Sequence, residues 1–224
     1  GWLTVDGDMN VTFQKEKVKE YIKGLASKYN TSGKPRSFVT ANGNTVEVRN
    51  GVYGWKINQD KEYEKLVANI EAGETVKREP EYSRRAKSHE GNDFGNTYVE
   101  IDLSSQRLWF IKDGQKMMES DIVTGNPNKG NATPQGVYTV TYKTKNATLR
   151  GPKQPDGSYE WESPVSFWMP FNGGIGMHDA NWQSAFGGSR YKTHGSHGCV
   201  NMPYEKAKQV YGYIDAGTVV VCHY

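Results

Sequence analysis

The sequence predicts a mainly β domain, a sandwich or barrel with one helix near its end, preceded by a small α+β domain. Three observations lead to this fold class. Two amphipathic helical patterns occur before residue 73, short β-type segments follow one another closely from residue 97, and a polar stretch over residues 77–96 separates the two parts. We therefore expect an α+β domain with its linker at residues 1–90 and the mainly β domain at residues 91–224.

Three segments have the apolar spacing that is typical of helices. The first covers residues 13–29, with Thr12 as its expected N-cap. The second covers residues 60–72, where Gly73 is placed to end it. The third, in the second domain, covers residues 203–215 and starts with a proline, which suits the first turn of a helix.

Strands are predicted from short β-type segments bounded by turn residues. In the first domain, the turn signal Asn42-Gly43-Asn44 lies between two such segments and predicts a hairpin. The density of short strands in the second domain indicates a sandwich or barrel. Residues 144–163 contain several turn residues and predict a hairpin insertion or lid. The predicted strands are residues 37–40, 45–48, 53–57, 98–103, 107–111, 117–124, 137–142, 165–169 and 218–222.

Composition excludes several classes of protein. The net charge is +3, from 28 basic and 25 acidic residues, and no run of five Lys or Arg occurs, so nucleic acid is not an expected partner. No apolar run approaches the roughly 18 residues that span a bilayer. The first residues lack the pattern of a signal peptide. We expect the chain to be the soluble portion of a longer protein whose N-terminus carries the targeting signal.

The stretch Thr193-His194-Gly195-Ser196-His197-Gly198-Cys199-Val200-Asn201 concentrates reactive side chains, and three interpretations compete. A catalytic zinc site could use His178, His197 and Cys199, with Asp179 and His194 nearby, but the paired spacing of structural zinc sites is missing. A disulfide from Cys199 to Cys222 would have to join a glycine-rich turn to an apolar terminal strand. The third interpretation, a cysteine nucleophile, fits best, and we expect no metal and no cofactor.

A nucleophilic cysteine reacts as a thiolate, so its surroundings should lower the thiol pKa. Gly198 allows the backbone to approach a substrate, and a turn through residues 200–202 would bring the N-terminus of the predicted helix at Pro203 close to the sulfur. The base should come from elsewhere in the chain. His178, at the end of a strand predicted over residues 173–179, is the best candidate.

These residues resemble a known family. Met177-His178-Asp179, twenty-one residues ahead of the cysteine in Ser196-His197-Gly198-Cys199-Val200-Asn201, is similar to the signature of the L,D-transpeptidases, bacterial cell-wall enzymes. Thr124-Gly125 and Thr133-Pro134-Gln135-Gly136-Val137-Tyr138 are similar to a second element of their catalytic domain. The resemblance covers about residues 97–224, and the N-terminal part resembles the peptidoglycan-binding module that precedes this domain in some Gram-positive members.

The resemblance implies a role for each residue of the motif. Cys199 would be the nucleophile and His178 its general base, with the backbone carbonyl of Ser196 orienting His178. His197 and the amides of Gly198 and Cys199 would shape the oxyanion hole. Many members have arginine at the position of Asn201, near a substrate carboxylate. Three aromatic residues flank the motif: Trp168, Trp182 and Tyr191. They would line the substrate groove or belong to the core, and the core is favoured for Trp168.

The implied reaction is the formation of 3→3 cross-links in peptidoglycan. A tetrapeptide stem would acylate the cysteine with release of D-alanine, and the amine of a second stem would then accept the acyl group. Stem peptides are thus the expected partners. The alternatives are an L,D-carboxypeptidase or other thiol hydrolase of wall peptides, and a non-catalytic wall-binding protein. We expect an extracytoplasmic protein of a Gram-positive bacterium, in the wall or attached to the membrane by an anchor outside residues 1–224.

Overall fold

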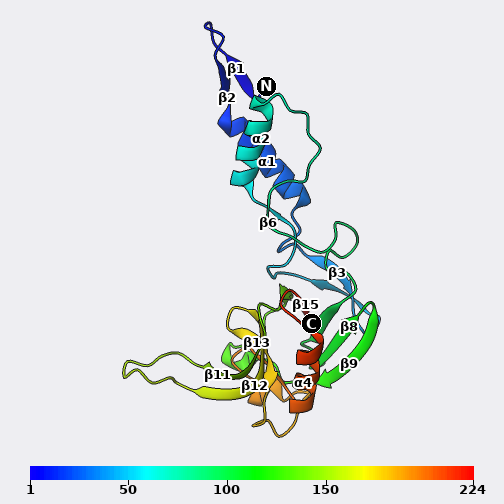
Figure 1. Cartoon of the computed structure of the whole chain (residues 1–224). Coiled ribbons are helices and arrows are strands. Elements are labelled where there is room, and N and C mark those ends of the chain that lie inside the picture. The colour runs from blue at the N-terminus through cyan, green and yellow to red at the C-terminus, as the bar shows by residue number, and fades with distance from the viewer.

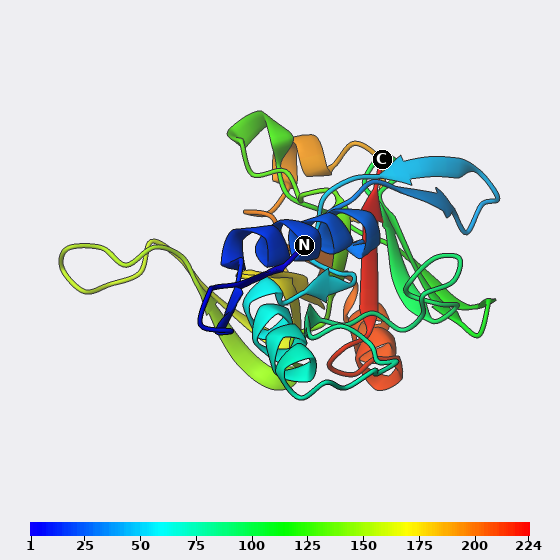
Figure 2. The ribbon, with the colours of Figure 1, turned by 90° about the horizontal axis from the view of Figure 1, so that it is seen from above.

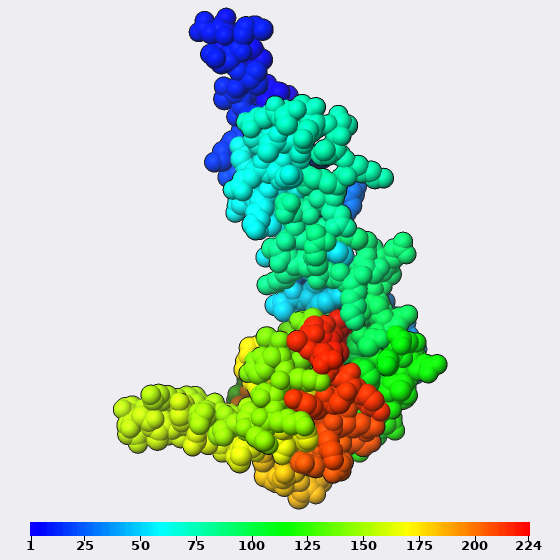
Figure 3. Space-filling model, in the orientation of Figure 1, coloured from blue at the N-terminus to red at the C-terminus, as the bar shows by residue number.

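The computed structural model describes residues 1–224 and has an elongated shape. Figure 1 shows two helices and a small hairpin at one end and a β-rich domain at the other, with the hairpin that begins with β3 between them. Figure 3 shows that a long arm projects sideways from the β-rich domain. No helix of the chain combines the length and the apolar character that a membrane span requires.

The N-terminal end is built on a pair of helices. α1 (Lys15–Tyr29) packs on α2 (Gln59–Glu71), and a hairpin of β1 (Leu3–Val5) and β2 (Val11–Phe13) precedes them. In Figure 2 the two helices are seen from above, in front of the β-rich domain. The expected cap at Thr12 is wrong, because Thr12 pairs with Thr4 in the hairpin and the helix begins three residues later, at Lys15, without a side-chain cap.

The middle of the molecule contains two short antiparallel pairs. The predicted hairpin is confirmed as β3 (Arg36–Val39) and β4 (Thr45–Val48). The strand expected over residues 53–57 is reduced to β5 (Lys56–Ile57). It pairs with β6 (Tyr82–Arg84), a strand inside the stretch expected to be only a linker.

The β-rich domain contains two sheets. The five-stranded sheet has the order β10-β15-β7-β8-β9, and the four-stranded sheet has the order β11-β12-β13-β14. β15 pairs parallel with β7, and β14 pairs parallel with β13. The bounds are β7 (Tyr98–Asp102), β8 (Arg107–Lys112), β9 (Gln115–Asp121), β10 (Gly136–Thr139), β11 (Thr144–Arg150), β12 (Glu162–Asn172), β13 (Ile175–Asp179), β14 (Val200–Met202) and β15 (Val219–His223).

Short helices complete this domain. α4 (Tyr204–Tyr213) confirms the predicted third helix, whereas η1 (Pro127–Lys129) and α3 (Tyr191–His194) were not expected. The turn expected over residues 200–202 is wrong, because this segment forms β14, which pairs in parallel with β13. Residues 144–163 form most of the β11–β12 hairpin, the projecting arm of Figures 1 and 3, which confirms the predicted hairpin insertion.

A shared core joins the two sheets as a sandwich, which confirms the predicted fold class. The alternation of side chains along β15 shows the arrangement: Val220 and Cys222 point into the sandwich core, whereas Val219 and Val221 belong to a second cluster on the outer face of the sheet. Burial on both faces explains why this strand is a continuous apolar run.

The β3–β4 hairpin covers that outer face. Its Phe38 and Val48 pack with Val219 and Val221. At the same place the buried Glu100 carboxylate accepts hydrogen bonds from the amide of Ala41, at 2.9 Å, and contacts Nε2 of His223 at 3.2 Å. The hairpin is thus held to the β-rich domain, and the boundary near residue 90 stays a prediction.

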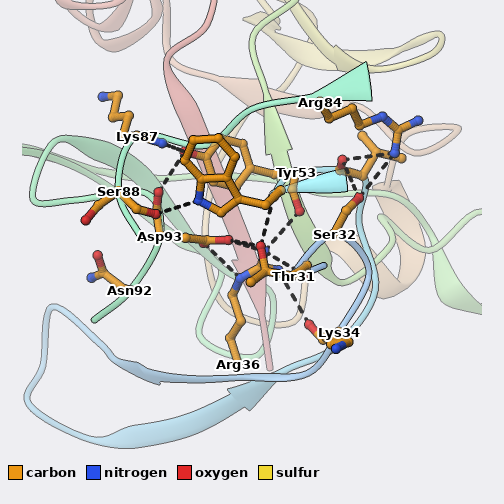
Figure 4. Close-up of polar contacts among 12 residues, drawn as sticks. Thr31, Ser32, Lys34, Arg36, Tyr53, Arg84, Lys87, Ser88, Asn92 and Asp93 are labelled. Carbon is orange, nitrogen blue, oxygen red and sulfur yellow. Dashed lines mark hydrogen bonds and ion pairs between the residues drawn. The ribbon is translucent and has the colours of Figure 1, made fainter. Parts of the chain in front are cut away.

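A second polar contact region lies between the helices and the hairpin, and we call Thr31, Arg36, Tyr53 and Asp93 the junction cluster (Figure 4). The Arg36 guanidinium donates to both carboxylate oxygens of Asp93, at 2.8 and 3.1 Å, and to the backbone oxygens of Thr31 and Tyr53. Asp93 also accepts from the Thr31 hydroxyl. A cavity of about 850 Å³ adjoins this cluster.

Candidate active site

The outer face of the four-stranded sheet carries the candidate catalytic residues. In the register of the sheet, Trp168 lies opposite His178, which lies opposite Asn201. Their neighbours along each strand, Met177 and Val200 among them, point into the sandwich core, so alternation turns His178 and Asn201 outward. Cys199 directly precedes β14 and shares the outward side with Asn201. The parallel pairing of β13 with β14 therefore brings the distant cysteine and histidine segments together.

A cavity of about 420 Å³ opens on this face. The predicted residues that line it are His178, Trp182, Ser196, His197, Cys199 and Asn201. Gly198 is buried and does not line the cavity. Tyr191 does not line this cavity and instead lines a separate one of about 70 Å³.

The His178 ring is held by its own strand. Its Nδ1 lies 2.8 Å from the backbone oxygen of Asp179, and because a carbonyl only accepts, Nδ1 carries the proton and Nε2 keeps its lone pair. The side chain is only 3% exposed, and the burial lowers its pKa, although the Asp179 carbonyl and carboxylate act in the opposite direction. The rings of Trp168 and Trp182 lie 5.9 and 5.8 Å from it. His178 is therefore a neutral imidazole with a free lone pair.

The Cys199 thiol is also neutral at rest. The residue is half-buried, and its sulfur lies 3.6 Å from the backbone oxygen of Gly174. Loss of hydration raises the pKa of this thiol to about 11, opposite to the lowering expected from the sequence. One reason is that β14 separates the cysteine from the N-terminus of α4. The pair therefore rests as thiol and imidazole rather than as an ion pair.

Hydrogen bonds within the loop fix the backbone before the cysteine. The Ser196 hydroxyl donates to the Cys199 carbonyl at 2.6 Å and accepts from the Gly198 amide at 3.0 Å. The expected contact between the Ser196 carbonyl and His178 is not formed, because Nδ1 of His178 bonds to the Asp179 carbonyl instead. The Ser196 carbonyl accepts from the amide of Asn126 at 2.9 Å. The amides of His197 and Cys199 donate to no protein group, so they are the free donors at this site.

The second motif supports the loop from behind. The Thr133 hydroxyl donates to the Gly198 carbonyl at 2.7 Å and accepts from the Gly125 amide at 2.9 Å. A Cβ on Gly125 would lie 1.9 Å from the backbone oxygen of Asn131 and 2.7 Å from the Cα of Gly198. Only glycine therefore permits this approach. Gly198 itself has a φ of +123°, which L side chains rarely adopt.

Three charged or aromatic residues at the cavity were missed by the sequence analysis. Trp161, from the β11–β12 hairpin, stacks on the His197 ring with centroids 5.1 Å apart and planes 8° apart. Lys129 and Arg190 bring positive charge to the cavity wall. No local signal marks these residues, because each comes from a different segment and only the fold brings them together.

The alternatives for the cysteine can be compared with this geometry. No group of three or more His, Cys, Asp or Glu side chains lies close enough together to hold a metal ion. Both cysteines are free thiols: Cys222 is fully buried in the sandwich core, and Cys199 lies on the opposite side of the other sheet. The arrangement at residue 199 is that of a thiol beside a neutral base, with free backbone donors nearby.

Comparisons with known proteins agree with this geometry. The family described as "L,D-transpeptidase catalytic domain" matches residues 96–222, and the one described as "Putative peptidoglycan binding domain" matches residues 1–77. A cysteine-to-serine mutant of the Enterococcus faecium L,D-transpeptidase is 38% identical, with a TM-score of 0.79, over 99% of this chain and 87% of that one. The Ldtfm-avibactam carbamoyl enzyme is 38% identical, with a TM-score of 0.81, over 100% of this chain and 85% of that one.

The catalytic domain of the E. faecium enzyme acylated by ertapenem is 44% identical, with a TM-score of 0.51, over 58% of this chain and 98% of that one. No curated protein sequence matches the chain. Fold and site together define a two-sheet sandwich domain with a cysteine and a histidine on one outer face. Since the family match covers more than half of the residues, the chain belongs to the L,D-transpeptidase family. Its two matched domains imply a protein that acts on the cell wall outside the cytoplasm.

Proposed function

We propose that the chain is a cysteine-dependent L,D-transpeptidase that forms 3→3 cross-links in peptidoglycan through a thioester on Cys199. One observation carries the proposal: the Cys199 thiol and the His178 imidazole, whose Nε2 is unprotonated, line the same small cavity on the same face of a sheet. A nucleophile and its base need this common access to the reacting carbonyl.

The first half-reaction acylates the cysteine. The donor is a tetrapeptide stem, and the sulfur attacks the carbonyl between its third residue and the terminal D-alanine. Because the resting thiol is neutral, its proton passes to Nε2 of His178 as the carbon–sulfur bond forms. The carbon–nitrogen bond then breaks, D-alanine leaves with the proton returned by His178, and a thioester remains.

The second half-reaction transfers the acyl group. The side-chain amine of the third residue of another stem attacks the thioester and loses its proton to His178. The carbon–sulfur bond breaks, and the proton restores the thiol. Water in place of the amine would give the L,D-carboxypeptidase reaction at the same residues.

The free backbone amides near the sulfur support this mechanism. The N–H groups of His197 and Cys199 have no protein acceptor, so they can donate to the oxygen that becomes negative in each tetrahedral intermediate. The Gly198 amide already donates to the Ser196 hydroxyl, and we therefore assign Ser196 and Gly198 to the shape of the loop rather than to the oxyanion.

The relatives add support for a reactive cysteine. One of the similar structures is a cysteine-to-serine mutant, one is a carbamoyl enzyme formed with avibactam, and one is acylated by ertapenem. We therefore expect a carbapenem to acylate Cys199 in this chain. The mass of the intact protein should rise by one drug molecule.

The test uses the two cysteines as a matched pair. Cys199→Ala should prevent the mass increase, and Cys222→Ala, which removes the buried thiol of the sandwich core, should leave it in place. Modification of Cys199→Ala to the same extent as the wild type would refute the assignment.

Product analysis separates the alternatives. With a disaccharide-tetrapeptide as the substrate, a cross-linked dimer that lacks one D-alanine is the expected product. A tripeptide without dimer would indicate a carboxypeptidase. No release of D-alanine under any condition would indicate a non-catalytic wall-binding protein.

We further propose that residues 1–90 hold the enzyme to peptidoglycan, in a Gram-positive cell envelope, with a membrane anchor outside residues 1–224. The match of residues 1–77 to a peptidoglycan-binding family supports this. Co-sedimentation of the whole chain with purified sacculi tests the binding, and no retention above an unrelated protein of similar charge would refute it.

A further inference from the structure

The cavity beside Cys199 carries positive charge alone. Lys129, the last residue of η1, and Arg190, which directly precedes α3, both line it, whereas no Asp or Glu does. The two elements are connected, since the side-chain amide of Asn128 donates to the Lys192 carbonyl at 2.9 Å. The two cations are therefore held on one joined part of the wall.

Neither cation is neutralised by the protein. The Lys129 ammonium makes no hydrogen bond and no ion pair. The Arg190 guanidinium donates to the Gln183 side-chain oxygen at 2.9 Å and to the Ser184 hydroxyl at 3.0 Å, both of which are uncharged. These bonds fix the direction of the guanidinium and leave its charge uncompensated. A site of this kind favours an anionic ligand.

An apolar part of the wall comes from the projecting hairpin. Leu149 of β11 and Trp161, just before β12, form this part. The cavity thus combines a cationic part on η1 and α3 with an apolar part on the hairpin. Cys199 and His178 also line it, so a bound anion would be close to the reacting carbonyl.

We infer that Lys129 and Arg190 bind the C-terminal carboxylate of the donor stem. The inference rests on the proposed function, in which the leaving D-alanine is the last residue of the donor. Its carboxylate is then only one residue away from the carbonyl that Cys199 attacks. The two cations make the enzyme selective for donors that end at the fourth residue with a free carboxylate, because amidation or extension removes the charge from that position.

The test compares two donors that differ in one group. Both are disaccharide-tetrapeptides with lysine as the third residue and an amidated second residue, so the C-terminus bears the sole carboxylate; the second donor ends in D-alaninamide. For the whole chain, Lys129→Gln should raise KM for the first donor about tenfold, with little change in kcat, and leave both constants unchanged for the second. Lys129→Arg should restore KM.

Two further variants complete the design. Arg190→Gln should show the same dependence on the donor, with thermal unfolding measured to confirm that the fold is kept. Lys112→Gln removes an exposed lysine that forms no ion pair. It lies on β8 of the five-stranded sheet, which contributes no residue to the cavity, so the change should affect neither donor's constants.

The outcomes separate this inference from the proposed function. Equal losses for both donors in Lys129→Gln would overturn the carboxylate assignment alone. So would an effect that appears only when diaminopimelate replaces lysine, because the carboxylate involved would then belong to the third residue. Absence of turnover by the unmodified chain would refute the proposed function, and this assignment with it.

Discussion

Two polar cavities of this molecule differ in how well their polar groups are paired. The cavity beside the junction cluster is the larger, about 850 Å³ against about 420 Å³. There the Arg36 guanidinium and the Asp93 carboxylate satisfy one another and their neighbours (Figure 4). Beside Cys199, the His178 Nε2, the amides of His197 and Cys199, and the Asn201 side-chain oxygen have no protein partner.

The difference indicates which cavity is a site of chemistry. A buried polar group without a partner costs free energy, so several such groups in the wall of one cavity indicate a place where a ligand completes them. Asn201 is the clearest case, since its side chain is 2% exposed and faces the same side of the sheet as His178. The junction cluster has no such vacancy and serves to hold the N-terminal helices and the β-rich domain together. Pairing, rather than cavity size, identifies the site.

The largest expected effect is the loss of the base. His178→Gln keeps a polar side chain of similar size but cannot accept the thiol proton at neutral pH. We expect acylation by a carbapenem to slow by about a thousandfold. Stopped-flow fluorescence of the acylation step measures this. A loss of less than tenfold would show that another group removes the proton.

Substitutions in the junction cluster should lower the free energy of unfolding and leave the acylation rate unchanged. Arg36→Met leaves the buried Asp93 carboxylate without its cation and should cost about 3 kcal/mol of unfolding free energy. Lys28→Met, which alters an exposed lysine lining the same cavity, is the matched control and should stay within about 0.5 kcal/mol of the wild type. Denaturant unfolding and acylation rates should be measured on both. A slower acylation by folded Arg36→Met would contradict the contrast between the two cavities.

The pH dependence should separate the two buried histidines. The pKa of His178 lies below its ordinary value of 6.5, so acylation should stay constant as the pH falls from 8 to 6.5 and decline only at lower pH. Protonation of His178 also favours the unfolded chain, so the stability that its neutral form provides is lost as the pH falls below 6.5. An acylation rate that already falls between pH 8 and 7 would show that His178 is not the titrating base.

His223 should behave in the opposite way. Burial opposes its charge, but the Glu100 carboxylate, together with Asp102, outweighs this and raises its pKa above 6.5. The pair with Glu100 therefore stabilises the fold fully below pH 6.5, and this contribution is lost as the pH rises through the raised pKa. Thermal unfolding between pH 5 and 9 should show this slope in the wild type, and Glu100→Gln should remove it without shifting the acylation profile.

The smallest expected effect concerns the projecting hairpin. Trp161→Ala removes the ring that stacks on His197, a contact worth about 1 kcal/mol. If the hairpin closes over the donor, KM for stem peptides should rise about fivefold while acylation by a small drug changes less than twofold. Tyr159→Ala, an exposed ring on the same hairpin, is the control. Equal losses in both assays would make the hairpin a structural strand pair.

Local sequence patterns were sufficient for most elements of the fold. The helices α1, α2 and α4, the β3–β4 hairpin and the strands around residues 98–111 follow from apolar periodicity and turn residues, because these depend on near neighbours. The strands β6 and β14 were missed because they depend on distant residues and not on near neighbours. Each is only three residues long and exists because of a partner from another part of the chain, β5 in one case and β13 in the other.

For the site, the sequence by itself singled out Cys199 and His178, since residue type and motif spacing are local properties. Only the tertiary structure decided what surrounds them. Burial favours the neutral forms of the thiol and the imidazole, and it raises the thiol pKa where the sequence predicted a lowered one. A hydrogen bond from His178 to the carbonyl of Asp179, and not to that of Ser196, fixes the imidazole tautomer. Desolvation and the convergence of Lys129, Trp161 and Arg190 depend on how distant segments pack, and no local pattern encodes them.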